Sequence, residues 1–293
     1  MTALLTRVRS RVAIHAHRRI RGLLDGEYAS VLTGRSMEFN DLREYVRGDD
    51  VKDIEPKASA RSGTLLIKRY AAIRKHTVLL VVSTGSGMAA YHDEANPKID
   101  LALLVAGTLG YLAVRHGDLV GGAYGDAAGV HRLPTSGGEL ALERGLRRIQ
   151  AAVDPAGAPG DLAALLAHIA RSVRRRCIVL VVTDTLRLSP GARSTLRRLV
   201  AQHEVLFCTI GEVDPTGVRG APVVDLATGQ PLPGWLADQQ LAEEHQRARE
   251  AELAELARAL DRLGIAHTHL SDDAQAIPAV FSLVERHRRV RRR

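Results

Sequence analysis

Nearly continuous apolar, strand-like runs that alternate with helical patterns are the feature that most constrains the fold of this chain. Such runs cover residues 76–82, 177–182 and 205–210. A strand that is apolar on both faces has to be covered on both faces, as in parallel sheets with crossover helices. Helical patterns lie between the runs, so residues 76–287 are expected to form a doubly wound, mostly parallel α/β domain.

Capping signals and apolar periodicity place the remaining elements. Asn96-Pro97 and Ser189-Pro190 each put a capping residue before a proline, which is typical of the first turn of a helix. Two strands are expected at 119–124 and 129–133, and a last strand at 265–270. Helices are expected at about 97–117, 138–152, 161–175, 190–203 and 237–263, with a final helix that reaches the C-terminal arginines.

The first quarter of the chain has a different pattern. Basic and apolar residues interleave over residues 1–24, which predicts a basic N-terminal arm, helical and poorly tied to the rest. Residues 25–75 contain turn signals and an extended run at 64–71, which predict a small β-rich extension. Residues 288–293 are expected to form an arginine tail.

The net charge is +8, and much of the excess sits at the two ends, with six arginines in the first 22 residues and six in the last eight. Terminal arginine clusters suggest contact with nucleic acid or an acidic partner, or else solvated arms. Aromatic residues make up only 3% of the chain, which disfavours base stacking. Nucleic-acid binding through basic arms is therefore kept as the alternative function.

The cysteine content and the hydropathy pattern indicate where the protein acts. Cys177 and Cys208 are the only two cysteines, and both fall at or inside predicted strands, so no disulfide framework is expected. No signal peptide is visible, and the uncharged apolar stretch at residues 101–114 is too short to span a bilayer. The expected location is the cytoplasm.

In doubly wound sheets, ligands bind beyond the carboxyl ends of the strands. The first such end is the segment 83–88, Ser-Thr-Gly-Ser-Gly-Met. Three interpretations are open: a loose dinucleotide fingerprint, a magnesium loop of the Asp-x-Ser-x-Ser type, or a tight glycine-rich turn without a ligand. The dinucleotide interpretation lacks a helix start directly after the loop and an acidic residue about 20 positions on.

Other strand ends carry further candidates. Asp184 follows the strand at 177–182 and is either a site residue or a capping residue. Glu212 and Asp214 follow the strand at 205–210 and are interpreted as loop residues in contact with solvent. His267 and His269 alternate on one strand face, but two ligands without a third do not predict a metal site.

A string of residues ahead of the first apolar strand is specific enough to suggest a family. It resembles the start of domain-of-unknown-function family number 58, whose members carry it before a von Willebrand factor A-like sheet. Many members are encoded beside MoxR-type AAA+ ATPases. The resemblance covers roughly residues 25–285, and the string consists of Gly34, Glu38, Phe39, Leu42, Arg43, Tyr45, Gly48, Asp49, Ile54, Ser59, Ala60 and Arg61.

The resemblance implies a von Willebrand factor A-like fold and an adaptor role in which a metal at the strand ends is shared with a partner's carboxylate. The five positions of that metal site are Ser83, Gly85, Gly87, Gly160 and Asp184, and only Asp184 keeps the family's residue. A degenerate site without a metal is therefore expected. Restoring Asp, Ser, Ser and Thr at the first four positions is expected to create metal-dependent stabilisation.

The sequence shows no Walker A loop, no Gly-x-Ser-x-Gly elbow and no His-Glu-x-x-His motif. We therefore expect a non-enzymatic interaction module without a cofactor, whose partner is a MoxR-type AAA+ ATPase. Arg43, Asp49, Asp50 and Arg61 form a charged group around a turn. This group is either a salt-bridged brace between the extension and the sheet or a partner surface.

Overall fold

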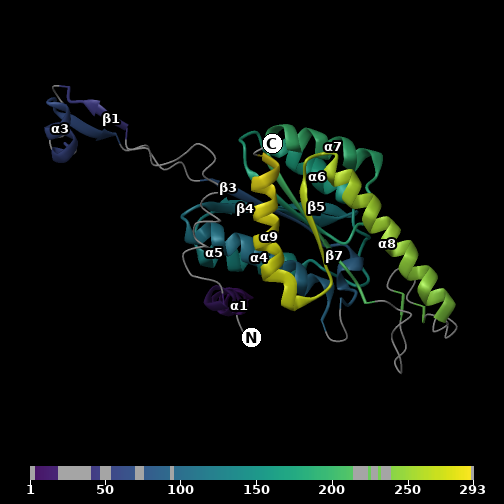
Figure 1. Cartoon of the computed structure of the whole chain (residues 1–293). Coiled ribbons are helices and arrows are strands. Elements are labelled where there is room, and N and C mark those ends of the chain that lie inside the picture. Colours follow the sequence, from purple (N-terminus) through teal and green to yellow (C-terminus); the bar gives the residue numbers. More distant parts are fainter. Residues whose placement is uncertain are drawn as a thin grey trace. The chain divides into compact units, whose positions relative to one another are not determined.

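The computed structural model describes residues 4–18, 41–46, 54–69, 76–92, 96–213, 224–225, 230–231 and 239–291. The chain divides into a large unit, residues 1–31 and 76–293, and a small unit, residues 32–75 (Figure 1). Several predictions fall outside the described residues, namely those on Gly34, Glu38, Phe39, Gly48, Asp49, Asp50 and Asp214. The side chain of Arg43 is likewise not described.

A six-stranded sheet with the order β5-β4-β3-β6-β7-β8 forms the centre of the large unit. Counted within this unit, the order is 3-2-1-4-5-6, which is a doubly wound arrangement. β5 pairs antiparallel with β4 at one edge, and the other pairs are parallel. The predicted doubly wound, mostly parallel sheet is thus confirmed. The strands are β3 (Thr77–Ser83), β4 (Leu119–Asp126), β5 (Gly129–Ser136), β6 (Ile178–Thr183), β7 (Glu204–Ile210) and β8 (Ala266–Leu270).

Helices cover both faces of this sheet (Figure 1). α4 (Lys98–Arg115), α5 (Glu139–Ala151) and α9 (Asp273–Arg291) lie on one face. α6 (Leu162–Ser172), α7 (Pro190–Gln202) and α8 (Gln239–Asp261) pack on the other, around alternate residues of β3, β6 and β7. This two-sided cover explains why the strands are apolar throughout.

Helix α4 is buried along nearly its whole length, from Lys98 to Ala113. Because α1, α5 and α9 pack around it and β3 lies beneath it, the turns from Leu101 to Ala113 are covered on every side, and the charged residues of α4 are confined to its two ends. A helix that is apolar all round belongs in a protein core. In the described part of the chain, however, no helix is both long and apolar enough to cross a membrane.

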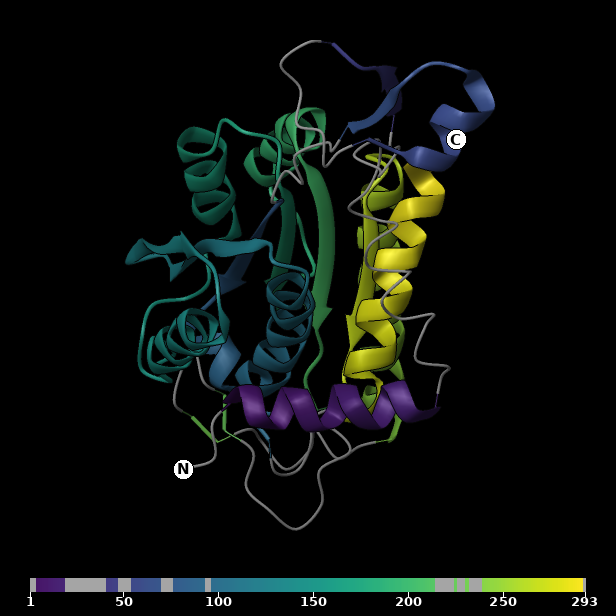
Figure 2. The same ribbon diagram turned by 90° about the vertical axis from the view of Figure 1, so that its left-hand side faces the viewer.

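The N-terminal segment differs from the predicted, poorly tied arm. Residues 4–18 form helix α1 (Leu4–Arg18), which packs on α4, α5 and α9 (Figure 2). Leu5, Val8 and Val12 are buried. Their spacing of three and four residues places them on one helix face. The apolar residues among the arginines therefore dock the helix onto the large unit.

Polar contacts hold both ends of the docked face of α1. The backbone N–H groups of Leu4 and Leu5 donate to the carboxylate of Glu143 on α5, at 3.1 and 2.8 Å. Arg7 and Arg11 bind Asp273 at the start of α9, at 2.7 and 2.9 Å. Burial tends to raise the pKa of Glu143, but these N–H groups and Arg147 outweigh it, and the pKa is lowered.

The small unit contains an antiparallel strand pair, β1 (Asp41–Glu44) and β2 (Leu66–Arg69). It also contains a short helix, α3 (Pro56–Ser62), that the β-rich prediction for this region did not include. Ser59 joins α3 to β2. Its hydroxyl accepts a hydrogen bond from the Leu66 N–H and donates one to the Glu55 carbonyl, both at 2.8 Å. This motif residue thus has a local structural role.

Candidate functional site at the carboxyl ends of the strands

The five positions predicted from the metal-site pattern lie together beyond β3 and β6, the two central strands. A Cβ built at Gly160 would lie 2.9 Å from the Ser83 hydroxyl and 4.0 Å from Asp184 Oδ1, and one at Gly87 would lie 2.5 Å from Asp184 Oδ2. β3 and β6 mark the point where the strand order reverses, which is the usual ligand position in doubly wound sheets. The sequence pattern thus located one compact cluster.

Glycine is required at position 85 by the approach of two loops. A Cβ there would lie 2.1 Å from the Gly160 nitrogen and 2.7 Å from the Pro159 carbonyl carbon. The Ser86 N–H donates to the Ala158 carbonyl at 2.9 Å, so backbone hydrogen bonding holds the loops together. These contacts agree with the interpretation of a tight glycine-rich turn.

The dinucleotide interpretation is wrong in two respects. The loop leads into a single 3₁₀ turn, η2 (Ser86–Ala89), whereas a dinucleotide fingerprint opens a full α-helix. In addition, the space in front of Gly85, where a pyrophosphate would approach the backbone, is filled by Pro159 and Gly160.

Lys98 contacts one of these five positions, Asp184, although no sequence pattern indicated a role for it. It is the first residue of α4, its side chain is 3% exposed, and its ammonium lies 3.1 Å from Asp184 Oδ2 and 3.0 Å from Glu212 Oε2. The only local signal was a lysine directly after Asn96-Pro97, where a mostly apolar helix begins. Its two partners are far away in sequence.

Glu212 lies exposed in the loop after β7, as interpreted, but it also forms two ion pairs that no sequence pattern indicated. It follows β7, and besides Lys98 it binds Arg249 of α8, with Nη1 to Oε1 at 2.5 Å. Burial by itself raises the pKa of Glu212, but the charges and hydrogen bonds of Lys98 and Arg249 outweigh it, so the pKa is lowered below its ordinary value of 4.5. We refer to Lys98, Asp184, Glu212 and Arg249 as the strand-end ion cluster.

The lowered pKa of Glu212 predicts how the free energy of unfolding changes at acid pH. A carboxyl whose pKa is lowered on folding stabilises the fold above its unfolded-state pKa, and this contribution is lost as the pH falls through the folded-state value. Glu212→Gln should therefore lower the free energy of unfolding by about 1 kcal/mol at pH 7, a modest value because the carboxylate is partly exposed. Urea unfolding should show the difference from wild type shrinking below about pH 4.

Glu255→Gln is the matched control, because that carboxylate is 62% exposed and bonds only Arg193 among the contacts described. It should change the stability little at either pH. A Glu212→Gln difference of equal size at neutral and acid pH would contradict the charge origin of this effect.

A magnesium ion does not fit the cluster as it stands. The position beside Asp184 holds an ammonium, and the glycines offer no side-chain oxygens. Magnesium requires about six oxygens in a near-octahedral array. Moreover, the described residues include no group of three His, Cys, Asp or Glu side chains arranged to hold a metal.

The remaining candidates are accounted for by local contacts. His267 lies 3.2 Å from Asp261, whereas His269 lies 3.0 Å from the Thr209 hydroxyl. Burial and Arg249 lower the pKa of His269. Cys177 and Cys208 are buried and unpaired, and burial raises the pKa of Cys208 to about 12, so this thiol is unreactive.

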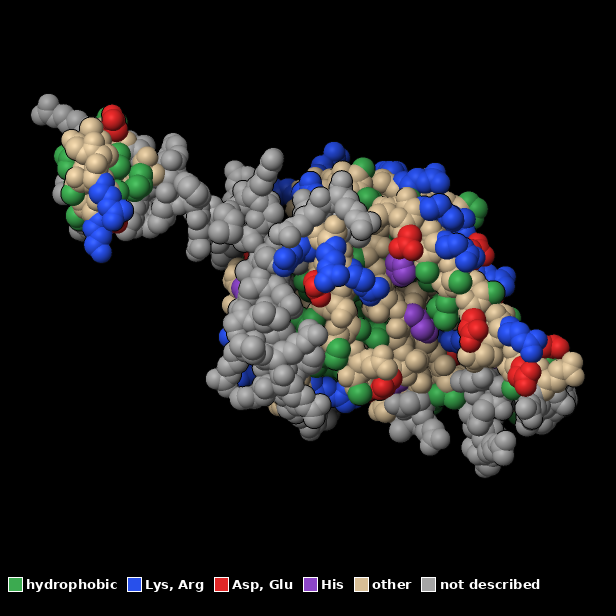
Figure 3. Space-filling view, viewed as in Figure 1, with side chains coloured by type: hydrophobic (Ala, Val, Ile, Leu, Met, Phe, Trp, Pro, Cys, Tyr) green, Lys and Arg blue, Asp and Glu red, His purple; other side chains and the backbone are tan. Residues whose placement is uncertain are grey.

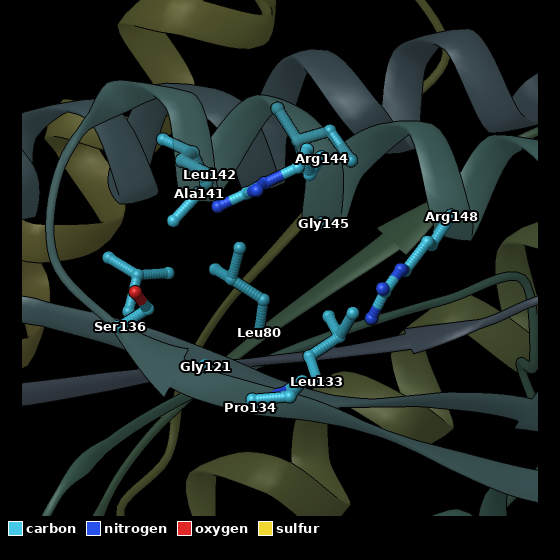
Figure 4. A pocket seen from close by; sticks show the side chains of 12 residues that line it. Leu80, Gly121, Leu133, Pro134, Ser136, Ala141, Leu142, Arg144, Gly145 and Arg148 are labelled. Carbon is cyan, nitrogen blue, oxygen red and sulfur yellow. The ribbon is translucent and has the colours of Figure 1, made fainter.

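A cavity of about 320 Å³ lies elsewhere on the large unit, between α5 and the strands β4 and β5 (Figure 4). Leu80, Leu133 and Leu142 form apolar walls, and Arg144 and Arg148 belong to its lining. The β4 residues that line it, Val120 and Gly121, come from the start of that strand, so the cavity is distant from the strand-end ion cluster. Its lining includes no carboxylate, histidine or cysteine.

The basic residues do not gather in one groove on the face seen in Figure 3. Lys and Arg side chains are spread over α7 and α8 with Asp and Glu among them. Arg187 and Arg193 bind Glu252 and Glu255, which joins the loop before α7, and α7 itself, to α8. Many basic side chains of the large unit are thus paired with acidic ones.

Comparisons with known proteins place the chain in a family. The model of the family described as protein of unknown function DUF58 matches residues 41–222, which is more than half of the chain. An uncharacterized protein of Mycobacterium bovis and one of Mycobacterium tuberculosis are each 27% identical over 273 residues, covering 92% of this chain and 85% of theirs.

Two solved structures are among those to which the chain shows some similarity. One is an aerotolerance-related membrane protein from Bacteroides fragilis, with 16% identity, a TM-score of 0.45, and coverage of 71% of this chain and 98% of that chain. The other is a von Willebrand factor type A protein from Catenulispora acidiphila, with 10% identity, a TM-score of 0.42, and coverage of 76% and 43%. On the family match, this chain belongs to the DUF58 family of proteins of unknown function.

Proposed function

We propose that this protein is a non-enzymatic interaction module of the cytoplasm that binds a MoxR-type AAA+ ATPase. The observation that carries the proposal is the strand-end ion cluster. In doubly wound folds, chemistry occurs at the strand ends. Here, the Lys98 ammonium pairs with both Asp184 and Glu212, at 3.1 and 3.0 Å, and Arg249 pairs with Glu212 as well. The cluster therefore offers no free nucleophile or base to a substrate.

The small unit supplies a surface that suits a protein partner. Leu42, Val46 and Leu65 are 39, 60 and 54% exposed, although they are large apolar residues. They lie on or next to the paired strands β1 and β2, with the Tyr45 N–H donating to the Leu65 carbonyl at 2.8 Å. By the strand register, Leu42 and Leu65 lie on opposite faces of the pair, so each face presents an exposed apolar side chain that a protein partner could cover. This favours the partner-surface interpretation over a brace.

Binding should be tested with the purified full-length protein and the MoxR-type ATPase of the same source, in the apo, ADP and ATP-analogue states. Leu65→Ser and Arg61→Glu change exposed residues of the small unit. Each should weaken binding by about tenfold while leaving the melting temperature unchanged, because neither residue is buried. Arg171→Glu, an exposed change on α6 of the large unit, is the matched control.

Two outcomes would oppose this proposal. Normal binding combined with a lower melting temperature in the small-unit variants would favour the brace. Absence of any complex in all three nucleotide states would remove the ATPase as the partner.

Nucleic-acid binding through the terminal arms has less support. Arg7, Arg9 and Arg11 are bound to Asp273 and Glu139, so these arginines are already engaged within the protein. Phosphate contacts make affinity fall steeply with salt. A nucleic-acid titration in which affinity falls steeply as salt rises would revive this function.

A further inference from the structure

We propose that the Lys98 ammonium is a built-in replacement for a divalent cation, and that removing it converts the strand-end ion cluster into a divalent-cation site. The inference concerns the cluster itself and does not depend on the identity of any partner. It assigns a role to a residue outside the five metal-site positions of the sequence pattern.

The ammonium lies between two carboxylate oxygens. Nζ of Lys98 contacts one oxygen of Asp184 and one of Glu212, from the ends of β6 and β7. The Ser83 hydroxyl, from the end of β3, is buried and has no hydrogen-bond partner among the residues that the structure describes. A Cβ at Gly160 would lie 2.9 Å from this hydroxyl and 4.0 Å from Asp184 Oδ1, so both side chains border the space in front of Gly160. Carboxylate and hydroxyl oxygens are the ligands that hard divalent cations prefer.

The charges explain why the wild-type cluster should refuse a metal. Asp184 and Glu212 carry two negative charges, while Lys98 and Arg249 carry two positive ones, so the cluster is neutral. A divalent cation would have to displace the Lys98 ammonium or be repelled by its positive charge. Without Lys98 the cluster has a net charge of −1, and two carboxylates remain beside the space that the lysine side chain occupied.

The cluster is also open enough for an ion to enter. Lys98 is 3% exposed, but the side chains of Asp184 and Glu212 are 18 and 42% exposed. Both side chains are therefore partly in contact with solvent, and water can complete a coordination shell. Calcium tolerates irregular geometry better than magnesium does, so the stronger response is expected with calcium.

The test compares four full-length proteins: wild type, Lys98→Ala, Lys98→Met and Lys98→Ala/Asp184→Asn. Melting temperatures are measured in EDTA and in increasing Ca²⁺, Mg²⁺ or Mn²⁺ up to about 10 mM. Wild type should not respond. Lys98→Ala should melt lower in EDTA and then rise by about 4 °C for each tenfold increase in cation above its Kd.

The other two variants separate a cation site from general salt effects. Lys98→Met loses the charge but fills the space, so it should be destabilised without recovery by cations. Lys98→Ala/Asp184→Asn lacks one carboxylate and should lose most of the cation response. If Lys98→Ala does not fold in EDTA, the same comparison is made on refolding yield with and without calcium.

Three results would overturn the proposal. The first is that wild type binds a divalent cation and that Asp184→Asn abolishes this binding. The cation would then bind although the ammonium is present, so the ammonium would not be its replacement. Lys98→Ala could be as stable as wild type in EDTA. Lys98→Ala could also be destabilised yet fail to respond, in melting or refolding, to any of the three cations.

Discussion

Gly85→Ser should destabilise the protein by about 3 kcal/mol or more, although serine is the residue that the metal-binding pattern has at this position. The new Cβ would lie 2.1 Å from the nitrogen and 2.5 Å from the Cα of Gly160. Both atoms belong to backbone, which cannot rotate away as a side chain can. The two loops would have to separate and lose the Ser86 to Ala158 hydrogen bond. Urea unfolding, monitored by circular dichroism, measures the loss.

Gly129→Ala is the control for this experiment. Gly129 begins β5, a Cβ there would meet no atom within 4 Å, and its backbone does not adopt a positive φ. Its stability should stay within about 0.5 kcal/mol of wild type. If Gly85→Ser were as stable as Gly129→Ala, the close approach of the two loops would be wrong.

The same contacts change the expectation for restoring the metal-site residues. Serine at 85 meets backbone, serine at 87 would bring its Cβ to 2.5 Å from Asp184 Oδ2, and the ammonium of Lys98 remains in place. The fourfold restoration of Asp, Ser, Ser and Thr is therefore now expected to destabilise the protein. A metal response should require the removal of Lys98 instead.

Leu5→Ala/Val8→Ala should lower the free energy of unfolding by roughly 3 kcal/mol, because α1 is part of the core. Leu5 and Val8 are 5 and 3% exposed. Val8 fits closely against α4, since a Cβ at Gly107 would lie 3.0 Å from Val8 Cγ2. Truncation of both side chains removes apolar burial and leaves a gap that the neighbouring helices fill only in part. Urea unfolding and limited proteolysis of residues 1–18 measure the effect.

Leu140→Ala is the control for α1, because Leu140 is 71% exposed on the neighbouring helix α5. It should leave the stability and the proteolytic pattern unchanged. A poorly tied arm would give the opposite pattern: no loss of stability in the double variant, and early cleavage within residues 1–18 in wild type.

Local sequence patterns predicted most of the sheet domain. The apolar strands at 76–82, 177–182 and 205–210 correspond to β3, β6 and β7 with small shifts at their ends. Such runs are readable because burial on both faces restricts every position to apolar residues. Helix α3 was missed, since its seven residues bury no side chain and leave no apolar periodicity.

The docking of α1 onto the large unit was only partly predictable from the sequence. Leu5, Val8 and Val12 have the spacing of a buried helix face, which the sequence contains. The arginines around them suggested a solvated arm, because their acidic partners Glu139 and Asp273 are more than a hundred residues away. The spacing of the apolar residues therefore indicated that one face of α1 is buried, whereas the surrounding arginines did not indicate whether the helix is docked or solvated.

The sequence by itself determined the doubly wound fold, the family, and the cluster of five positions beyond the central strands. Each depends on residues next to one another in the chain or on an ordered string of them. Only the tertiary structure decided what the cluster contains. Lys98 is 86 residues from Asp184 and 114 from Glu212, and no local pattern encodes that distance. Parallel strands with long crossovers bring these charges together, because all of their carboxyl ends meet at one edge of the sheet.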